Sequence, residues 1–233
     1  MSKKIMIIDF EGKSTVRPYN LGIVIGDRKG NICSLNSLCF SFAFQENIQS
    51  KGGKIANQLT IEKINTITES VKNREGQFLD VTLNQFIYAF NCIIDKYNIT
   101  EVWAYNMAFD KSALRRLIGD KYFTELCKKV EFFDMIPMVL PKLLTKKYIK
   151  YCKKNGYISE KSKSPQYKAE VVYRYLFDKE DYIEKHWGLN DALDEYKILC
   201  KMFTQKKKII KKSNGGYTWK MLKEFAKDKN ITL

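Results

Sequence analysis

The apolar residues of this chain first follow the alternation typical of strands and later mainly the periodicity typical of helices. Residues 5–10 form a short, continuous apolar run, which is typical of a strand buried on both faces. Residues 20–26 alternate, residues 27–30 have the composition of a turn, and residues 31–44 alternate loosely again. Because the connections between these runs are short, we expect three strands in an antiparallel meander.

The rest of the chain mixes helical periods with two more short apolar runs. We predict helices at residues 60–72, 82–96 and 110–117, and strands at residues 101–105 and 130–133. Thr82 would be the N-cap of the second helix. From Met135 onward the pattern is helical. The sequence therefore predicts an α/β fold: a mixed five-stranded sheet, antiparallel in strands 1–3 and parallel in strands 4–5, flanked by helices.

The charge of the chain narrows the class of its partners. Lysine and arginine together number 41 against 26 acidic residues, which gives a net charge of +15. Such a field attracts polyanions, of which nucleic acid is the commonest and an anionic membrane surface a distant second. We expect no membrane span and no secretory signal, because no apolar stretch approaches the ~18 residues that a span needs. The six cysteines are scattered without a closely spaced pair, so we expect reduced, mostly buried thiols in a cytoplasmic, intracellular protein.

Two acidic residues end the first predicted strand. Asp9 and Glu11 stand two residues apart, so their side chains would point to the same face of the strand, roughly 7 Å from each other. Two carboxylates at that spacing can share divalent metal ions, while Phe10 between them would pack into the opposite side. The alternative is a solvated strand end, because acids often flank buried strands.

Two further segments place acidic residues at the starts of helices. Asn106 ends a predicted strand, and Asp110 falls in the first turn of the next helix, where the helix dipole favours an acid. His186, the only histidine, precedes Asp191 by five residues, which is about 140° around a helix axis. The two can converge only if His186 lies in the loop before the helix, a geometry that Gly188 permits. The alternatives are a capping aspartate, an ordinary turn asparagine and a surface histidine.

In their order along the chain, these residues resemble the motifs of the DEDDh 3′–5′ exonuclease superfamily, which has an RNase H-like fold and includes proofreading subunits of replicative polymerases and oligoribonucleases. The matching segments are Asp9-Phe10-Glu11, Asn106-Met107-Ala108-Phe109-Asp110, and His186 followed by Asp191-Ala192. Two positions depart from the family pattern: Tyr105 replaces a frequent histidine, and Gly188 replaces a usual alanine. Neither would be a metal ligand. Trp187 excludes the sister subfamily, which has a catalytic tyrosine at that position.

The resemblance implies a catalytic site and a mechanism. The implied metal ligands are four acids, which would gather two Mg²⁺ or Mn²⁺ ions about 4 Å apart over the scissile phosphate: Asp9, Glu11, Asp110 and Asp191. His186 would complete the catalytic set as the general base that takes the proton of the attacking water. The residues implied to hold the terminal nucleotide are Gly12, Lys13, Ser14, Asn106 and Phe109. The implied reaction releases nucleoside 5′-monophosphates from the 3′ end of single-stranded DNA or RNA.

The predicted chain consists of a nuclease domain and a basic tail. Residues 1–204 would form the exonuclease domain, with an exposed lysine-rich insertion at residues 142–163, and residues 205–233 a basic helical extension. The lysines that could hold phosphates, or could equally be solvated faces, are Lys142, Lys146, Lys147, Lys150, Lys153 and Lys154, and a second cluster at residues 206–212.

Two other functions stay open beside the exonuclease. One is a polymerase-associated proofreading subunit, in which apolar residues of the tail would dock on a partner. The other is a non-catalytic nucleic-acid-binding protein that keeps the fold. The sequence does not distinguish DNA from RNA as the substrate, and it leaves the biological role, the protein partner and the oligomeric state open.

Overall fold

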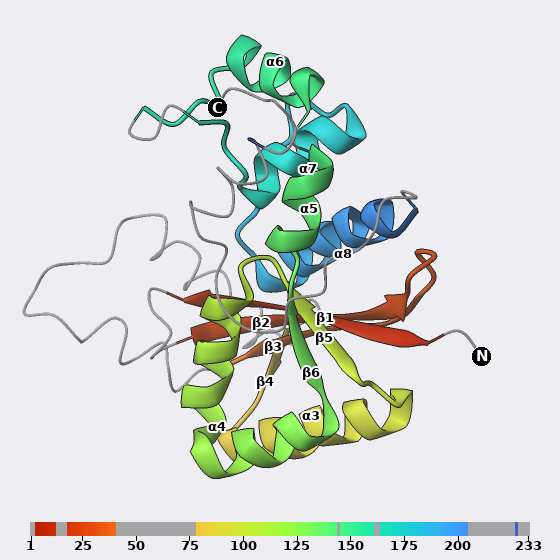
Figure 1. The fold of residues 1–233 in the computed structure, drawn as a ribbon. Coiled ribbons are helices and arrows are strands. Elements are labelled where there is room, and N and C mark those ends of the chain that lie inside the picture. Colours follow the sequence, from red (N-terminus) through yellow and green to blue (C-terminus); the bar gives the residue numbers. More distant parts are fainter. Residues whose placement is uncertain are drawn as a thin grey trace, which may run out of the picture.

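A six-stranded mixed sheet runs through the computed structural model, which describes residues 3–12, 18–40, 78–143, 145–160, 164–204 and Lys227 (Figure 1). The order of the strands across the sheet is β4-β3-β2-β1-β5-β6. In chain order their bounds are β1 Lys4–Gly12, β2 Pro18–Asp27, β3 Ile32–Cys39, β4 Phe78–Asp80, β5 Glu101–Ala104 and β6 Glu131–Asp134.

The pairing of the strands confirms the predicted fold class. β1 pairs with β2 and β2 with β3 in antiparallel fashion, whereas β1 pairs with β5 and β5 with β6 in parallel. This is the predicted RNase H-like arrangement, although β3 ends at Cys39 and residues 41–44 lie outside the described residues. The sequence does not predict β4, which pairs in parallel with β3, because three residues are too few to show a period.

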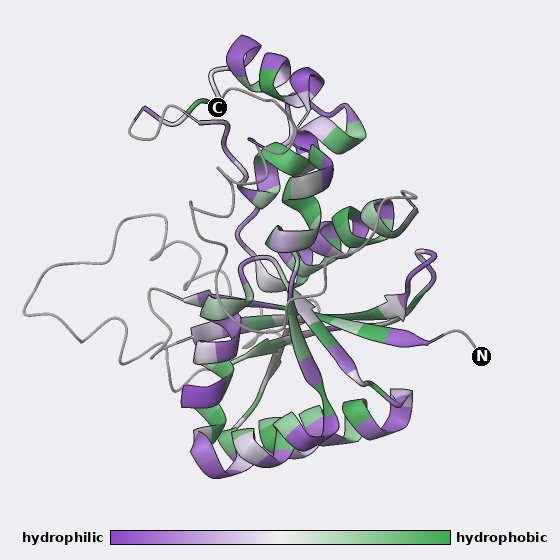
Figure 2. Ribbon diagram, in the orientation of Figure 1, coloured by the Kyte–Doolittle hydropathy of each residue, from purple (hydrophilic) through white to green (hydrophobic). Residues whose placement is uncertain are grey.

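Helices cover both faces of the sheet (Figures 1 and 2). α3 and α4 lie on one face, and α5 to α8 are grouped on the other. The alternation of side chains along β1 serves both layers, since Met6 and Phe10 enter the core of the α3–α4 layer while Ile5 and Ile7 enter the core of the α5–α8 layer. The helix bounds are α3 Leu83–Tyr97, α4 Met107–Lys129, α5 Ile136–Leu143, α6 Lys146–Lys154, α7 Ala169–Phe177 and α8 Gly188–Thr204.

The ends of α3 and α4 show where local sequence signals hold and where they fail. The predicted N-cap of α3 is confirmed, because the Thr82 hydroxyl accepts the backbone N–H of Gln85 and the Gln85 side chain accepts the backbone N–H of Thr82. The predicted end of the next helix at Leu117 is wrong. Gly119, with φ of 79°, lets the chain kink and resume the helix as far as Lys129. The predicted helix at residues 60–72 lies outside the described residues.

Two expectations drawn from composition are wrong in part, namely the exposure of the lysine-rich insertion and the burial of most cysteines. The prediction that the lysine-rich insertion is exposed is wrong for Lys142, which is 5% exposed and donates its Nζ hydrogen to the carbonyl oxygen of Met202. All six cysteines are free thiols, but only Cys39 and Cys152 are buried, so the expectation of mostly buried thiols is wrong. None of the described helices is both long enough and apolar enough to cross a membrane. Apart from Lys227, the tail at residues 205–233 lies outside the described residues.

Candidate metal and catalytic site

Asp9 and Glu11 come from the end of β1, on the face of the sheet that α8 covers. Because side chains alternate along a strand, both continue the row of Ile7, which packs in the core of the α5–α8 layer. In the antiparallel pairing with β2, Asp9 lies opposite Gly22 and Glu11 lies opposite Asn20. The two acids therefore face the helix across the surface of the sheet.

Two glycines set the distance between α8 and the sheet. A Cβ atom on Gly22 would lie 2.0 Å from the backbone of Gly188, and one on Gly188 would lie 2.6 Å from the nitrogen of Gly22. Gly188 also donates its backbone N–H to Asn20 Oδ1 at 3.0 Å. A Cβ atom at either glycine would therefore clash with the backbone across this contact between β2 and α8. The contact brings Asp191, in the first turn of α8, against the end of β1.

Asp110 reaches β1 from the first turn of α4, as the sequence predicts. Its Oδ1 accepts the backbone N–H of Phe10 at 2.9 Å, so a main-chain contact holds this acid at the end of β1. The turn before α4 is fixed in the same way by Asp134, at the end of β6, whose Oδ1 accepts the backbone N–H of Asn106 at 3.2 Å. Asn106 itself is left-handed, with φ of 67°.

His186 lies in the loop before α8, which confirms the geometry that the spacing of the motif requires. Its φ is 53°, and the helix begins two residues later at Gly188. One ligand atom from each of Glu11, His186 and Asp191 lies within 4.8 Å of the others, close enough for a single metal ion to contact all three. The imidazole is 53% exposed, and its Nδ1 lies 3.8 Å from Glu184 Oε2.

Burial raises the pKa values of three aspartates in this group. The pKa of Asp110 is raised to about 8 and that of Asp191 to about 9, in each case by burial and then by neighbouring carboxylates. The pKa of Asp9 is raised well above its ordinary value, first by burial and then by the charges of the surrounding acids, Glu195 foremost. Such a group carries its full negative charge at neutral pH only when cations offset it.

Two oxygen atoms of the group lack hydrogen-bond partners. Among the residues that the structure describes, Asp9 Oδ2 and Asp191 Oδ1 are shielded from solvent and accept no hydrogen bond. A buried carboxylate oxygen without a donor is unfavourable. Carboxylate oxygens with an imidazole nitrogen are ligands that divalent cations accept. The residues present therefore fit divalent metal binding.

Glu195 adds a further buried acid that none of the sequence motifs marks. It is 4% exposed, and its Oε2 accepts the backbone N–H of Tyr105 at 3.0 Å. Burial and the charge of Asp110 raise its pKa well above the ordinary value. Glu195 follows Asp191 by four residues, or about one helical turn, and so lies on the same helix face. That spacing is the signal from which it could have been found.

The residues predicted to hold the terminal nucleotide are only partly described. Gly12 ends β1 next to the acids of that strand. Asn106 is exposed, and Phe109 is partly buried against the core of the α3–α4 layer, both at the start of α4. Lys13 and Ser14 lie outside the described residues. The structure thus brings Asn106 and Phe109 into the same turn as Asp110, and their contact with substrate stays a prediction.

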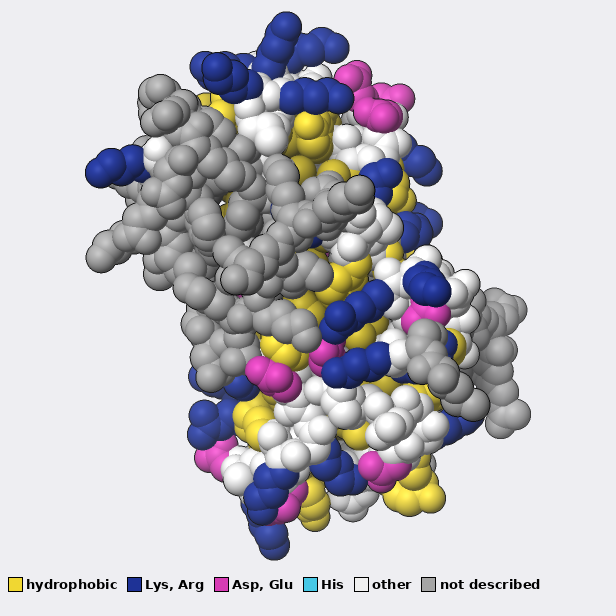
Figure 3. Space-filling view, turned by 45° about the vertical axis from the view of Figure 1, so that its right-hand side comes forward, with side chains coloured by type: hydrophobic (Ala, Val, Ile, Leu, Met, Phe, Trp, Pro, Cys, Tyr) yellow, Lys and Arg dark blue, Asp and Glu magenta, His cyan; other side chains and the backbone are white. Residues whose placement is uncertain are grey.

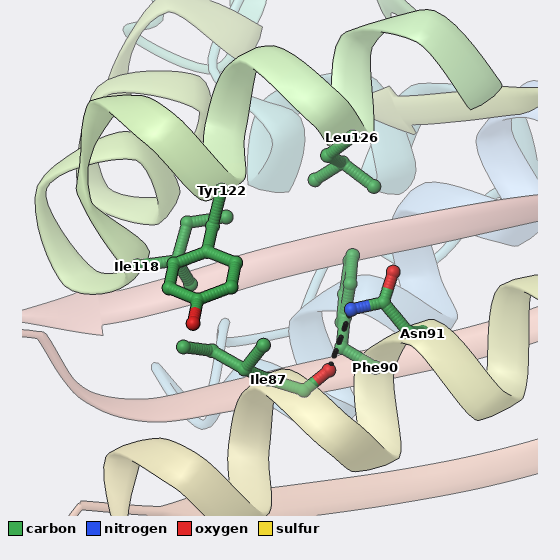
Figure 4. Close-up of a pocket in the computed structure, with 6 residues that line it drawn as sticks. All are labelled: Ile87, Phe90, Asn91, Ile118, Tyr122 and Leu126. Atoms are coloured by element: carbon green, nitrogen blue, oxygen red, sulfur yellow. Dashed lines mark hydrogen bonds between the residues drawn. The ribbon is translucent and has the colours of Figure 1, made fainter.

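A small apolar pocket between α3 and α4 is separate from this site (Figure 4). None of its lining residues is an acid or a histidine. The side-chain amide of Asn91 donates to the carbonyl oxygen of Ile87 at 2.9 Å, so this polar group is already satisfied. The lining residues are Ile87, Phe90, Asn91, Ile118, Tyr122 and Leu126.

Comparisons with known proteins give a distant likeness in fold. No protein-family model and no curated protein sequence matches the chain. Among solved structures, the chain is similar to the zinc-bound form of E. coli ExoI in complex with single-stranded DNA, with 12% sequence identity and a TM-score of 0.49. The match covers 88% of this chain and 41% of ExoI, so the chain spans less than half of that protein. A likeness this distant does not assign a function to the chain. The function has to be inferred from the side chains of the site.

Proposed function

We propose that this protein is a metal-dependent 3′–5′ exonuclease, which hydrolyses phosphodiester bonds at the 3′ end of single-stranded DNA or RNA and releases nucleoside 5′-monophosphates. One observation carries the proposal. Three segments far apart in the sequence converge on a group of buried acids beside the only histidine, and two of the carboxylate oxygens lack a hydrogen bond. The order of these residues is that of the DEDDh motifs, and a net charge of +15 suits a polyanionic substrate.

The acids of the group have the role of metal ligands in this proposal. Asp9, Glu11, Asp110 and Asp191 would hold two divalent ions, Mg²⁺ or Mn²⁺. When bound, the ions would offset the negative charge of the phosphate and make a water molecule more acidic. His186 would take the proton of the attacking water as general base, a contribution of typically ~10²–10⁴ in rate. Because its imidazole is 53% exposed, it can return that proton to the solvent after each cleavage.

The start of α4 and the end of β1 would hold the terminal nucleotide. Asn106 and Phe109 lie in the same turn as Asp110, so a nucleotide bound over this turn would have its phosphate near the acids. Gly12 lacks a side chain and would let a sugar approach the backbone at the strand end. We assign Lys13 and Ser14 to the same role on their place in the sequence after the first motif.

The test is digestion of oligonucleotides that carry a label at one end. With Mg²⁺ or Mn²⁺, a 3′ label should leave at once as a mononucleotide, while a 5′ label should remain on a ladder of progressively shorter products. Parallel DNA and RNA substrates determine the substrate class. Chelation by EDTA should abolish both patterns.

Three variants connect the activity to the site. Asp9→Asn and His186→Ala should each abolish release of nucleotides or lower it by at least 10²-fold, as expected for removal of a ligand or a base. Asp120→Asn is a matched control, because this aspartate of α4 has a side chain that is 77% exposed and pairs with Arg115. A native protein that binds oligonucleotides but cleaves none with any metal would instead support the non-catalytic binding protein. Cleavage that survives Asp9→Asn and His186→Ala would refute the assignment of the site.

A further inference from the structure

α6 presents all of its lysines on one face. At ~100° per residue, the five lysines fall within an arc of about 120° around the helix axis, and all of them are exposed. Tyr148 and Cys152 point the other way and are buried. Lys and Arg side chains gather at the end of the molecule that α6 forms (Figure 3; α6 is labelled in Figure 1). The five residues of this lysine face are Lys146, Lys147, Lys150, Lys153 and Lys154.

The positive charge of the lysine face is not balanced within the described part of the chain. Lys154 lies 3.9 Å from Glu180, but the other four lysines pair with no acid that the structure describes. Lys146 and Lys147 occupy the first helical turn, which contains no acid and where the helix dipole disfavours positive charge. Lys150 adds repulsion four residues after Lys146. Such a pattern weakens its own helix, and it favours an anionic partner from outside the described part of the chain.

A short series of hydrogen bonds attaches α6 to the candidate site. The Tyr148 hydroxyl of α6 donates to the carbonyl oxygen of Gln166 at 2.6 Å. The carbonyl oxygen of the next residue, Tyr167, accepts the hydroxyl of Tyr105 at 2.5 Å, and the backbone N–H of Tyr105 donates to Glu195 within the group of acids. These hydrogen bonds therefore hold the helix that carries the lysine face in place relative to the group of acids.

We propose that the lysine face of α6 binds the phosphates of the single strand on the 5′ side of the nucleotide that is removed. This inference rests on the proposed function and names the surface that holds the uncleaved part of its substrate. Lys146, Lys150 and Lys153 form a row about 10 Å long at 1.5 Å per residue, long enough to contact two or three successive phosphates. Lys142 takes no part, because it is buried and bound to Met202.

The experiment measures binding in EDTA, where no cleavage occurs, as a function of salt. The probe is a labelled 20-nucleotide single strand, and the variant is Lys146→Ala/Lys150→Ala/Lys153→Ala, in which alanine favours the helix. Each phosphate contact contributes about −0.7 to the slope of log affinity against log salt, so the triple variant should have a slope about 2 less steep. Between 50 and 200 mM salt the native protein should then lose roughly 20-fold more affinity than the variant.

A matched control and a short substrate separate the possible causes. Lys96→Ala/Lys121→Ala/Lys128→Ala removes the same charge from exposed positions of α3 and α4 and should leave the slope unchanged. With Mg²⁺, the lysine-face variant should cleave a dinucleotide as fast as the native protein, because the single phosphate between its two nucleosides would lie at the acids and leave none for α6 to bind. An equal change of slope in both triple variants, or no change in either, would overturn the proposal. If the native protein does not cleave the dinucleotide, that result counts against the proposed exonuclease. The salt slopes of the two triple variants would still test whether the lysine face binds phosphates.

Discussion

Replacing Asp191 by asparagine should stabilise the protein when no metal is present. Asp191 is 4% exposed, its Oδ1 has no hydrogen bond among the described residues, and burial among other acids raises its pKa to about 9. At pH 7 the folded protein therefore retains a proton on Asp191 that the unfolded chain releases, and this destabilises the fold. The asparagine side chain would keep the shape of the aspartate without that penalty.

The size of the effect follows from the difference in pKa. The ordinary pKa of an aspartate is ~3.9. For each pH unit above that value, a proton that only the folded state retains lowers the free energy of unfolding by about 1.4 kcal/mol, which amounts to about 4 kcal/mol at pH 7. Since part of this is returned by an amide that lacks ideal partners, we expect Asp191→Asn to gain about 2–4 kcal/mol. For a chain of this length that is a rise in Tm of roughly 5–15 °C.

The assay is thermal unfolding in EDTA across a pH series. The gain should be small near pH 4 and absent below about pH 3, where Asp191 is protonated in both states, and it should grow as the pH rises towards 9. Added Mg²⁺ should raise the Tm of the native protein much more than that of the variant. Asp194→Asn is the control on the same helix, because Asp194 is paired with Lys197 at 2.7 Å and should gain nothing. An unchanged or lower Tm for Asp191→Asn at pH 8 would refute the reasoning.

Three further predictions use other parts of the structure. The free energy of unfolding of the native protein in EDTA, and with it the Tm, should fall as the pH rises from 5 to 8. The fall should be about 1.4 kcal/mol per pH unit for each retained proton, because the raised pKa values of Asp110 and Asp191 keep protons on the folded state. A flat profile would show that these pKa values are not raised. Gly188→Ala should lower the Tm, at a cost of ~1–3 kcal/mol, and abolish nucleotide release, since the new methyl group would lie 2.6 Å from a backbone nitrogen; full activity would contradict the close contact. Arg28→Ala should cost ~1–3 kcal/mol in urea unfolding, because Glu101, at 3% exposure, would lose two hydrogen bonds of 2.9 and 2.7 Å but keep those from Lys3 and Trp103. A change below ~0.5 kcal/mol would show that the pair is dispensable.

The sequence was informative wherever a period or a spacing extends over several residues. The alternation of residues 20–26 and the cap at Thr82 are local signals, and both predict elements that the structure contains. A glycine within a helical stretch, by contrast, does not indicate whether the helix ends there. Gly119 is a residue type that often ends helices, but here the chain kinks at Gly119, with φ of 79°, and the helix resumes. Nothing near it in the sequence distinguishes a helix end from a kink.

The candidate site shows the same division between local and distant information. The spacing of His186 and Asp191 requires the histidine to precede the helix, and the structure places it there. How closely α8 approaches β1 depends on Gly22 and Gly188, which are far apart in the sequence and meet only in the folded chain. The spacing of four residues places Glu195 on the helix face of Asp191, but the sequence does not show that Glu195 is buried, because most acids on helices are solvated.

The meeting of Gly22 and Gly188 has a consequence for engineering. Main chain rests on main chain at this point, and Gly188 also donates to the Asn20 side chain, so these contacts set the separation between the acid of α8 and those of β1. The solvent-facing positions of α8, such as Lys201, can therefore be randomised in a library without disturbing the spacing on which metal binding would depend. Selection for activity from a library that also varies the two glycines should return glycine at both and tolerate diversity at the exposed positions, Lys201 and Thr204.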